Sequence, residues 1–545
     1  MSKNGLVSAY LLLLFAVNPF TTTKASDFNI SALLKSSSEA EAVSYLPEKQ
    51  LSFPFIIAQA ALSSDSFQAV MAQIFSINSP QLAAQSIYEA RLVGEVSYLD
   101  DRLETASPLR PAKILNRRYS LGVEKGHQFG GQISANIIHE RMDQKIDLQG
   151  QAPGGLNFSS DYFETRLEVG IQQSLWKNRF GVSSQWHNVA AKHRSEVLKQ
   201  ELKIAINNWF DDYLEIFSSA WLAKERVKSA ITNVKRRERL LEMTNIRLSR
   251  GMAERSDVLQ AESALIDAQI NYNKSYQALS EIWKGLVVGL NLPRNWIDFD
   301  PMKIPLSPFG EAEEALQLCS KYTGVSDMQV IHPEVKKWKE AQKAANYQLR
   351  VAKESMKPSV NLFAQISTNA VDSNRSTETF TNLSRVDHNS VQVGVNLNIP
   401  LSRFSERAEL ANAYSQSMQS DALAKQSIKA FEVQWINTCN ALSVQKSVLG
   451  KNKVSFDNQL ERLSLEEQRF RIGRTSMSSV IQAGDDLAAA ELNLRSNESN
   501  YYYQSWRVLS LASKVLSVIE DYIEKYTPEK MSFDQVIRQA SKSID

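Results

Sequence analysis

Three stretches of the chain alternate between apolar and polar residues, which is the period of a β-strand. The clearest runs from Val391 to Ile399 and ends at Pro400. The stretch from Leu167 to Leu175 alternates in the same way, and so does Val360 to Ile366, with Phe363 as its exception. Such strands fit a membrane barrel with lipid on one side and a wet lumen on the other. They fit an amphipathic strand of a soluble sandwich equally well.

Long segments on either side of these strands have the period of an α-helix. From Val197 to Phe217, apolar residues recur at steps of three and four. The apolar face is too broad for a simple two-helix seam, so this helix should contact neighbours on more than one side. At about 1.5 Å per residue, residues 188–250 would span about 90 Å. Gly251 then turns the chain, and a second helix of similar chemistry follows from Ala261.

The two halves of the chain share one plan of helix, strands and long helical region. Arg247–Gly251 is followed by Ser256–Ala261, and Phe470–Gly473 is followed by Ser478–Ala483. Each glycine interrupts a long helical pattern, and each lies seven residues before a Val-Leu or Val-Ile pair. The shared order of elements predicts two structural repeats per chain.

This plan predicts the following organisation. A signal peptide at 1–25 precedes repeat 1 at 50–296, which has strands at 91–175 and a helical hairpin at 183–290. An equatorial linker at 297–332 then leads to repeat 2 at 333–520, which has strands at 358–400 and a helical hairpin at 404–520. A C-terminal tail at 521–545 follows. Residues 527–545 are amphipathic and form either a short helix on an equatorial belt or a free tail. We expect one helix before each set of strands, at about 52–90 and 310–355.

The N-terminus has the features of an export signal. Lys3 precedes an apolar stretch from Leu6 to Val17, and small residues near Ala25 offer a cleavage site. No cysteine follows this stretch, so we expect no lipid anchor there. After residue 30, no apolar run is long enough for a membrane helix. The mature chain would therefore enter a membrane only as a β-barrel, and a few strands per chain would require several chains to share one barrel.

Composition and motifs exclude several classes of function. The chain has 545 residues, 22% of them charged, and a net charge of +2, which argues against a nucleic-acid partner. Its six histidines form no metal-ligand pair at helical spacing, and it has no phosphate-binding loop or nucleophile elbow. We therefore expect no catalytic residue, cofactor or metal, and no enzyme activity. Cys319 and Cys439 are far apart in sequence, and we expect both to be packed thiols.

Several motifs in order along the chain resemble those of the TolC family of outer-membrane efflux and secretion channels, from about residue 50 to 520. They are Ser52–Ala60, Arg247–Val258, Lys357–Leu362 and Val393–Leu401. The resemblance implies a mixed α and β fold, in which a long antiparallel α-helical coiled-coil barrel joins a transmembrane β-barrel shared between three chains. It also implies four strands per chain, hence twelve per trimer, and a belt of short helices around the tunnel.

The resemblance further implies a function and partners. The homotrimer would be the exit duct of a tripartite efflux pump or type I secretion system in the outer membrane of a Gram-negative-type cell. Its closed periplasmic end would meet a periplasmic adaptor (membrane-fusion) protein and an inner-membrane pump, and its barrel would contact outer-membrane lipid. The alternative is an exported, soluble coiled-coil adaptor or scaffold protein. The sequence leaves the cargo, whether drug, metal or protein, open.

The chain departs from the family pattern in its first strand region, which is about twice as long as the second. Segment 101–160 contains two further alternating stretches, at 119–123 and 133–137, with Gly126, Gly130 and Gly131 as turn signals between them. These stretches are either a long extracellular loop with its own hairpin or additional barrel strands. Two extra strands per chain would enlarge the barrel of a trimer from twelve strands to eighteen.

The second departure is at the periplasmic tip. By resemblance, Arg247, Gly251, Met252 and Gly473 frame the two hairpin tips. Asp257 matches the family's aspartate that helps to close the tunnel, but Phe470 stands in place of its tyrosine partner and Thr475 in place of its arginine; Ser479 and Gln482 replace an aspartate ring. Arg471 and Arg474 are candidate substitute partners for Asp257, which is alternatively a solvated residue at a helix start. Asp485 and Asp486 are candidates for a deeper, cation-preferring constriction.

Overall fold

The structure is a computed structural model that describes residues 43, 46, 49–103, 113–147, 157–307, 313–322, 332–383 and 388–526. The predicted signal peptide at 1–25 and the tail at 527–545 lie outside the described residues. The chain divides into two compact units. We call residues 77–197 and 338–424 the sheet unit, and residues 1–76, 198–337 and 425–545 the helical unit.

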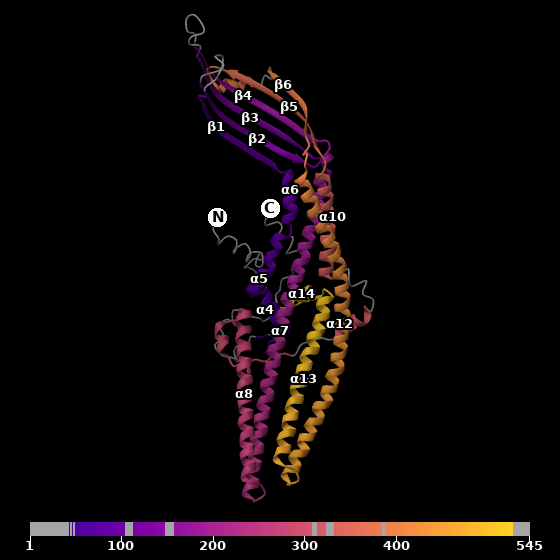
Figure 1. The fold of residues 1–545 in the computed structure, drawn as a ribbon. Coiled ribbons are helices and arrows are strands. Elements are labelled where there is room, and N and C mark those ends of the chain that lie inside the picture. Colours follow the sequence, from indigo (N-terminus) through magenta and orange to yellow (C-terminus); the bar gives the residue numbers. More distant parts are fainter. Residues whose placement is uncertain are drawn as a thin grey trace. The chain divides into compact units, whose positions relative to one another are not determined.

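The sheet unit contains one six-stranded antiparallel sheet whose strands follow one another in chain order (Figure 1). The additional alternating stretches of segment 101–160 form β2 and β3, which pair with each other and with β1 and β4. They are therefore strands of the sheet. The strands are β1 (Ala90–Asp101), β2 (Lys113–His127), β3 (Gly131–Asp147), β4 (Asn157–Ser174), β5 (Ser359–Asp372) and β6 (Asn389–Asn398).

The two faces of the sheet differ in chemistry, as the alternation predicts. One row of paired residues crosses all six strands on the apolar face, and every member is exposed: Leu92, Val123, Ala135, Val169, Ile366 and Val391. On the other face, Arg166 forms ion pairs with Glu164 at 2.7 Å and Glu168 at 3.6 Å. Arg118 and Glu140 form a further, cross-strand pair at 3.8 Å. The sheet therefore has one apolar and one charged face.

The short helix α11 (Ser376–Leu383), which lies between β5 and β6 in the chain, packs against β4 and β5. His139 and Thr165 are polar residues on the apolar face, which also has the Arg141–Asp161 ion pair at 2.7 Å towards the far end of β3 and β4. The helix α11 supplies partners for His139 and Thr165. The Thr165 and Thr379 hydroxyls are 2.6 Å apart, and Ser376 Oγ lies 3.0 Å from His139 Nε2. The helix thus satisfies the hydrogen bonds of these two polar side chains.

The long helices occur in two hairpins of matching lengths. The helices α7 (Val182–Ser249) and α12 (Phe404–Arg471) each have 68 residues. The helices α8 (Arg255–Gly289) and α13 (Met477–Leu511) each have 35 residues. The two hairpins thus have helices of equal length, and the division into two repeats stays a prediction. None of the described helices is long and apolar enough to cross a membrane.

The single helices expected at about 52–90 and 310–355 are each divided into shorter elements. Ser64, for example, ends α4 and begins α5, where its hydroxyl accepts a hydrogen bond from the Phe67 N–H at 3.2 Å. Such a serine cap ends one helix and starts another in a new direction. The shorter helices are α4 (Phe53–Ser63), α5 (Asp65–Met71), α6 (Ser79–Gln85), α9 (Glu313–Lys321), α10 (Pro333–Ser355) and α14 (Val515–Tyr526).

An aromatic cluster joins α4 to α7 and α13 inside the helical unit. The Phe53 ring lies 5.6 Å from Phe210, 5.3 Å from Phe217 and 5.4 Å from Trp506, centroid to centroid. All four side chains are buried. The hydroxyl of Ser52 accepts from the Phe55 N–H and starts α4, so the Ser52–Phe55 motif places the first aromatic residue in this core.

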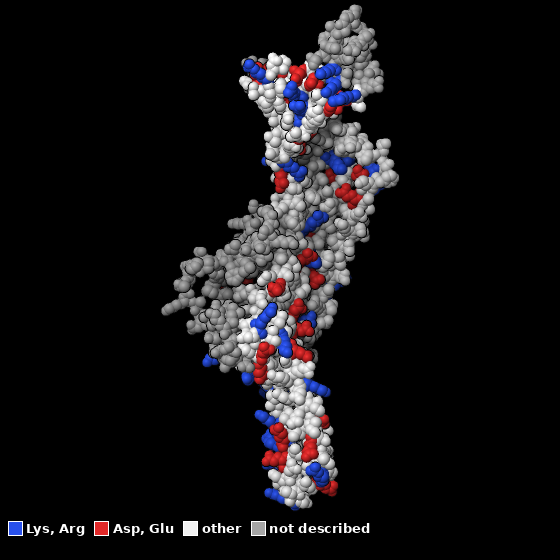
Figure 2. All heavy atoms as spheres, turned by 90° about the vertical axis from the view of Figure 1, so that its left-hand side faces the viewer, with Lys and Arg blue, Asp and Glu red and all other residues white. Residues whose placement is uncertain are grey.

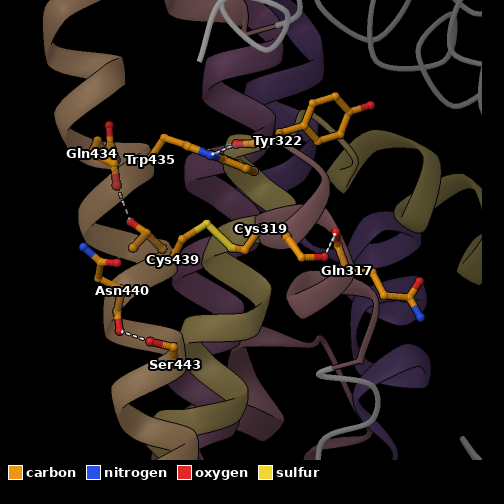
Figure 3. Close-up of a disulfide and its surroundings, with 10 residues drawn as sticks. Gln317, Cys319, Tyr322, Gln434, Trp435, Cys439, Asn440 and Ser443 are labelled. Atoms are coloured by element: carbon orange, nitrogen blue, oxygen red, sulfur yellow. Dashed lines mark hydrogen bonds between the residues drawn. A yellow bond between two sulfur atoms is a disulfide. The ribbon is translucent and has the colours of Figure 1, made fainter. Parts of the chain in front are cut away.

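Cys319 and Cys439 form a disulfide with a Cα–Cα distance of 5.6 Å, so the expectation of two packed thiols is wrong. They are 120 residues apart in sequence, but α9 packs on α12 and brings them together (Figure 3). The indole N–H of Trp435, one turn from Cys439, donates to the Tyr322 carbonyl oxygen at 3.2 Å. Disulfides persist in oxidising compartments outside the cytoplasm, which agrees with an exported chain.

Candidate functional site at the two hairpin tips

Both helical hairpins turn through the same backbone motif. Gly251 and Gly473 have φ angles of +68° and +73°, a left-handed conformation that glycine adopts without a steric penalty. The Gly251 N–H donates to the Leu248 carbonyl oxygen and the Met252 N–H to that of Arg247, at 2.9 Å and 2.8 Å. These two bonds define a Schellman motif, which ends a helix by satisfying its last carbonyl groups.

The second tip repeats this pattern of hydrogen bonds. The Gly473 N–H donates to the Phe470 carbonyl oxygen at 3.0 Å, and the Arg474 N–H donates to that of Arg469 at 2.9 Å. Gly251 and Gly473 therefore occupy equivalent positions, as do Leu248 and Phe470. The prediction that these glycines turn the chain is confirmed by their geometry.

The helices that follow the two turns begin with different caps. At the start of α8, the carboxylate of Asp257 accepts a hydrogen bond from the Glu254 N–H at 3.0 Å, and the Glu254 side chain caps Asp257 in return. This reciprocal pair is a capping box. At the start of α13, the Ser476 hydroxyl accepts from the Ser479 N–H at 3.3 Å.

Asp257 is thus engaged within its own hairpin. Within the described part of the chain, no ion pair joins it to Arg471 or Arg474, the two predicted substitute partners. The geometry agrees with the alternative of a residue at a helix start. An acidic residue in the first turn also interacts favourably with the helix dipole.

The contact between the two hairpins at the tips comes instead from Arg247. Its guanidinium lies over the Phe470 ring, 4.2 Å from the centroid. Arg247 Nη1 donates to the Phe470 carbonyl oxygen at 3.0 Å, and Nη2 donates to the Met252 carbonyl oxygen at 2.9 Å. One arginine therefore joins the end of α12 to the first turn through a cation–π contact and two hydrogen bonds.

Phe470 is the aromatic centre of a small core behind the second tip. Its side chain is buried, and it belongs to a cluster that draws on all four hairpin helices. Phe470 therefore contributes apolar packing at this tip. The buried members of this cluster are Leu240, Ala261, Leu463, Phe470, Met477, Val480, Ala483 and Leu487.

A second contact between the hairpins lies deeper along α7. The Arg237 side chain is only 5% exposed, and its guanidinium bonds to the Asp485 carboxylate and to the Ile481 carbonyl oxygen on α13. Burial lowers the pKa of the adjacent Arg236 guanidinium, and Glu491 opposes this shift. Arg236 and Arg237, two neighbouring residues of α7, are thus at least partly buried beside the acidic groups Asp485 and Glu491 of α13.

The side chains of Asp486, Gln482 and Thr475 are also hydrogen-bonded within the chain. Asp486 pairs with Arg462 at 2.7 Å and accepts from the Gln482 amide at 2.8 Å. The Thr475 hydroxyl donates to Glu466 at 2.8 Å. Both candidate constriction aspartates, Asp485 and Asp486, are therefore neutralised by arginines. The positive charge of these arginines offsets the carboxylate charge that would favour cations at this depth.

Sequence reasoning missed Arg237, although its spacing carried a signal. Arg237, Leu240, Thr244 and Arg247 follow one another at steps of three, four and three, which places them on one face of α7. Leu240 and Thr244 are buried on this face, together with Arg237. Arginines at such positions in an apolar stripe indicate partners on a neighbouring helix.

Elsewhere in the described residues, no group of three or more His, Cys, Asp or Glu side chains could hold a metal ion. Figure 2 shows Lys and Arg interspersed with Asp and Glu over the described part of the face it draws. This mixture matches the small net charge of +2.

The comparisons with known proteins agree with this architecture. The family described as outer membrane efflux protein matches residues 325–512. No curated protein sequence matches the chain. The Campylobacter jejuni CmeC outer membrane channel superposes with a TM-score of 0.63 at 11% identity, over 97% of this chain and 99% of that one.

Two further solved structures are similar in fold. The outer membrane protein VceC of Vibrio cholerae has a TM-score of 0.60 at 12% identity, over 84% of this chain and 95% of that one. The Neisseria gonorrhoeae MtrE outer membrane channel, in its open state, has a TM-score of 0.54 at 13% identity, over 90% and 94%. The matched family is described as efflux proteins, and CmeC and MtrE are described as channels, in agreement with the expectation that the chain is no enzyme. Residues 325–512 thus carry the sequence pattern of the outer membrane efflux proteins, and the chain has the fold of the TolC-like outer-membrane channels.

Proposed function

We propose that this chain is exported to the outer membrane of a Gram-negative-type cell and forms a homotrimeric exit duct there. The observation that carries the proposal is the six-stranded sheet with one exposed apolar face and one charged face. In a closed barrel, such a sheet presents the apolar face to lipid and the charged face to a water-filled lumen. The family match at 325–512 and the fold of known channels support the same function.

The tips of α7–α8 and α12–α13 are the proposed periplasmic entrance. A periplasmic adaptor protein and an inner-membrane pump would deliver cargo there, in a tripartite efflux pump or a type I secretion system. Arg237 and Arg247 connect the two hairpins of one chain at this end. They are the candidates for holding the entrance closed, in place of the tyrosine and arginine of the resembled channels.

Membrane fractionation tests the proposal directly. Outer and inner membranes are separated on a density gradient, and the protein is extracted in detergent and sized by light scattering with correction for bound detergent. We expect an outer-membrane species with the mass of three chains. A soluble periplasmic monomer would instead support the exported coiled-coil adaptor or scaffold.

A deletion strain separates the two channel roles. Loss of a drug- or metal-efflux duct should increase susceptibility to those compounds, whereas loss of a secretion duct should remove a protein from the culture medium. Complementation with the intact gene should restore the affected phenotype in either case. A deletion with neither phenotype would contradict both roles under the conditions used.

A further inference from the structure

We propose that the barrel of this channel has eighteen strands, six from each of three copies, and that β1 of one copy pairs with β6 of the next. The trimer and the membrane in this inference rest on the proposed function. The number of strands per chain comes from the sheet itself. The resembled channels have four strands per chain, so the inference concerns a difference from them.

The hairpin formed by β2 and β3 is inserted into the sheet and does not lie over it. The pairing of β1 with β2 extends from Ala90–Lys125 to Asp101–Ile114. The pairing of β3 with β4 extends from Gly131–Gln173 to Asp147–Asn157. If the hairpin were an extracellular loop, β1 would pair with β4. Here β2 and β3 separate those two strands along their lengths.

The inserted strands also continue the apolar face at the same level as the others. Val123 of β2 and Ala135 of β3 lie in the row that joins Leu92 on β1 to Val169 on β4. In the adjacent row, Leu121 pairs with Ile137. A hairpin that stood in water would gain nothing from exposed apolar side chains aligned in this way. All six strands therefore suit the same depth of lipid.

The two edge strands are complementary to each other. Within this sheet β1 pairs only with β2, and β6 pairs only with β5, so each edge has one row of backbone groups to satisfy. In lipid no water is present to bond these groups, so an unpaired edge is strongly unfavourable. Five successive antiparallel pairings leave β1 and β6 running in opposite directions. A β6 strand from a second copy can therefore extend the sheet at β1 in the same antiparallel sense.

Side-chain orientation supports the same partner. In β1, Leu92 and Val96 are on the apolar face, and in β6, Val391 and Val393 are on it. Joining the two edges keeps both apolar sets on the lipid side. With three copies the sheet closes with no free edge, which is the condition for a membrane barrel.

The extra strands widen the exit. With strands about 4.8 Å apart and tilted by about 40°, twelve strands close at a backbone diameter of about 24 Å and eighteen at about 36 Å. The barrel would then be about 1.5-fold wider than that of a twelve-stranded relative, in the size class of porins that hold an aqueous channel. An eighteen-stranded exit would therefore accommodate a bulkier cargo than a twelve-stranded one.

Cysteine cross-linking between copies tests the edge pairing. Glu95 of β1 and, one at a time, Ser390, Gln392 and Asn396 of β6 are replaced by cysteine, because all four lie on the lumen face. Oxidised, detergent-solubilised trimers are then run on non-reducing gels. We expect at least one pair, such as E95C with Q392C, to give covalent dimers and trimers that reducing agent separates. The native Cys319–Cys439 disulfide lies within one chain, so the wild-type protein should remain monomeric on the gel.

The matched control uses β3 in place of β1. If the working barrel had twelve strands, built from β3 to β6 of each chain, Asn136 of β3 would lie beside β6 of the next copy. The N136C variants with the same β6 cysteines should therefore fail to cross-link, and efficient cross-linking there would overturn the inference. Electron microscopy of the wild-type trimer provides a second measurement, since a barrel with twelve strands would refute the proposal without depending on any variant. Failure to find a trimer would refute the proposed function instead.

Discussion

The tips of the two helical hairpins share one backbone turn but differ in what surrounds it. Both use a left-handed glycine with the same pair of hydrogen bonds. At the first tip, a Cβ added to Gly251 would meet no atom within 4 Å, and Leu248 is partly exposed. At the second, the equivalent Phe470 is 3% exposed and centres an apolar cluster. The turn is thus repeated between the halves, while the packing is not.

The difference assigns separate tasks to the two hairpins. The first supplies the arginines, Arg237 and Arg247, and the second supplies their acceptors on α12 and α13. The two hairpins of one chain are therefore linked through unlike surfaces. Four sets of substitutions test how far this asymmetry extends.

Replacing Phe470 with alanine should have the largest effect. Truncation of a buried phenylalanine costs about 3–5 kcal/mol, and we expect a loss of this size in the local opening free energy of the α12–α13 tip. Native-state hydrogen exchange with mass spectrometry measures it. The matched Leu248→Ala change at the first tip should cost about 1 kcal/mol or less, because that side chain is already partly in water. Equal losses at the two tips would contradict the asymmetry.

The ion pairs should differ according to their burial. A double-mutant cycle of Arg237→Ala and Asp485→Ala should give a coupling energy of about 1–3 kcal/mol, because a hydrogen bond to a buried charged group is strong. In this pair Arg237 is buried, with 5% of its side chain exposed, although 55% of the Asp485 side chain is exposed. The control cycle, Arg462→Ala with Asp486→Ala, removes a pair whose side chains are 48% and 31% exposed. It should give about 0–1 kcal/mol. Thermal unfolding in a fixed detergent, checked by hydrogen exchange, measures both, and a larger coupling in the exposed pair would refute the interpretation.

The two turns should respond alike to glycine substitution. Gly251→Ala and Gly473→Ala each place a Cβ in a left-handed conformation, at a cost of about 1–2 kcal/mol. Asparagine tolerates this conformation better, so the corresponding Asn variants should retain more stability than the Ala variants. Hydrogen exchange at each tip gives the comparison. A difference between the two glycines as large as the cost itself would show that the turns are not equivalent.

Asp257→Ala should have the smallest effect. Loss of its part in the capping box should cost about 0.5–1 kcal/mol at the start of α8. Because Asp257 is engaged inside its own hairpin, we expect unchanged leakage of a large antibiotic through the proposed channel, with Ser476→Ala at the other hairpin as control. Increased leakage for Asp257→Ala alone would restore the role that the resemblance implies.

The sequence predicted what depends on local spacing. Alternation at Leu167 to Leu175 and Val391 to Ile399 located β4 and β6, and the glycines at 251 and 473 located the turns. These features depend on neighbours along the chain, where periodicity and backbone sterics act. The additional stretches at 119–123 and 133–137 were recognised as alternating. Alternation does not determine which strands pair with a hairpin, so the sequence did not distinguish additional strands of the sheet from a separate hairpin in a loop.

Features that depend on distant parts of the chain were not predicted. Cys319 and Cys439 meet only because α9 packs on α12. Asp485 was interpreted as a lumen charge, yet its partner Arg237 precedes it by almost half the chain. The polar residues His139 and Thr165 lie on an apolar face, and the packing of α11 supplies hydrogen-bond partners for both. Each case requires the tertiary arrangement that periodicity does not supply.

The disulfide makes the part of the chain between residues 319 and 439 a covalent ring. This ring contains α10, β5, α11, β6 and the first half of α12. In a chain-entropy description, closing a loop of this length removes about 5 kcal/mol of unfolded-state freedom. A protease that cuts once inside the ring, for example between α11 and β6, leaves both fragments attached through sulfur. A nicked chain would therefore keep its second pair of strands until the bond is reduced.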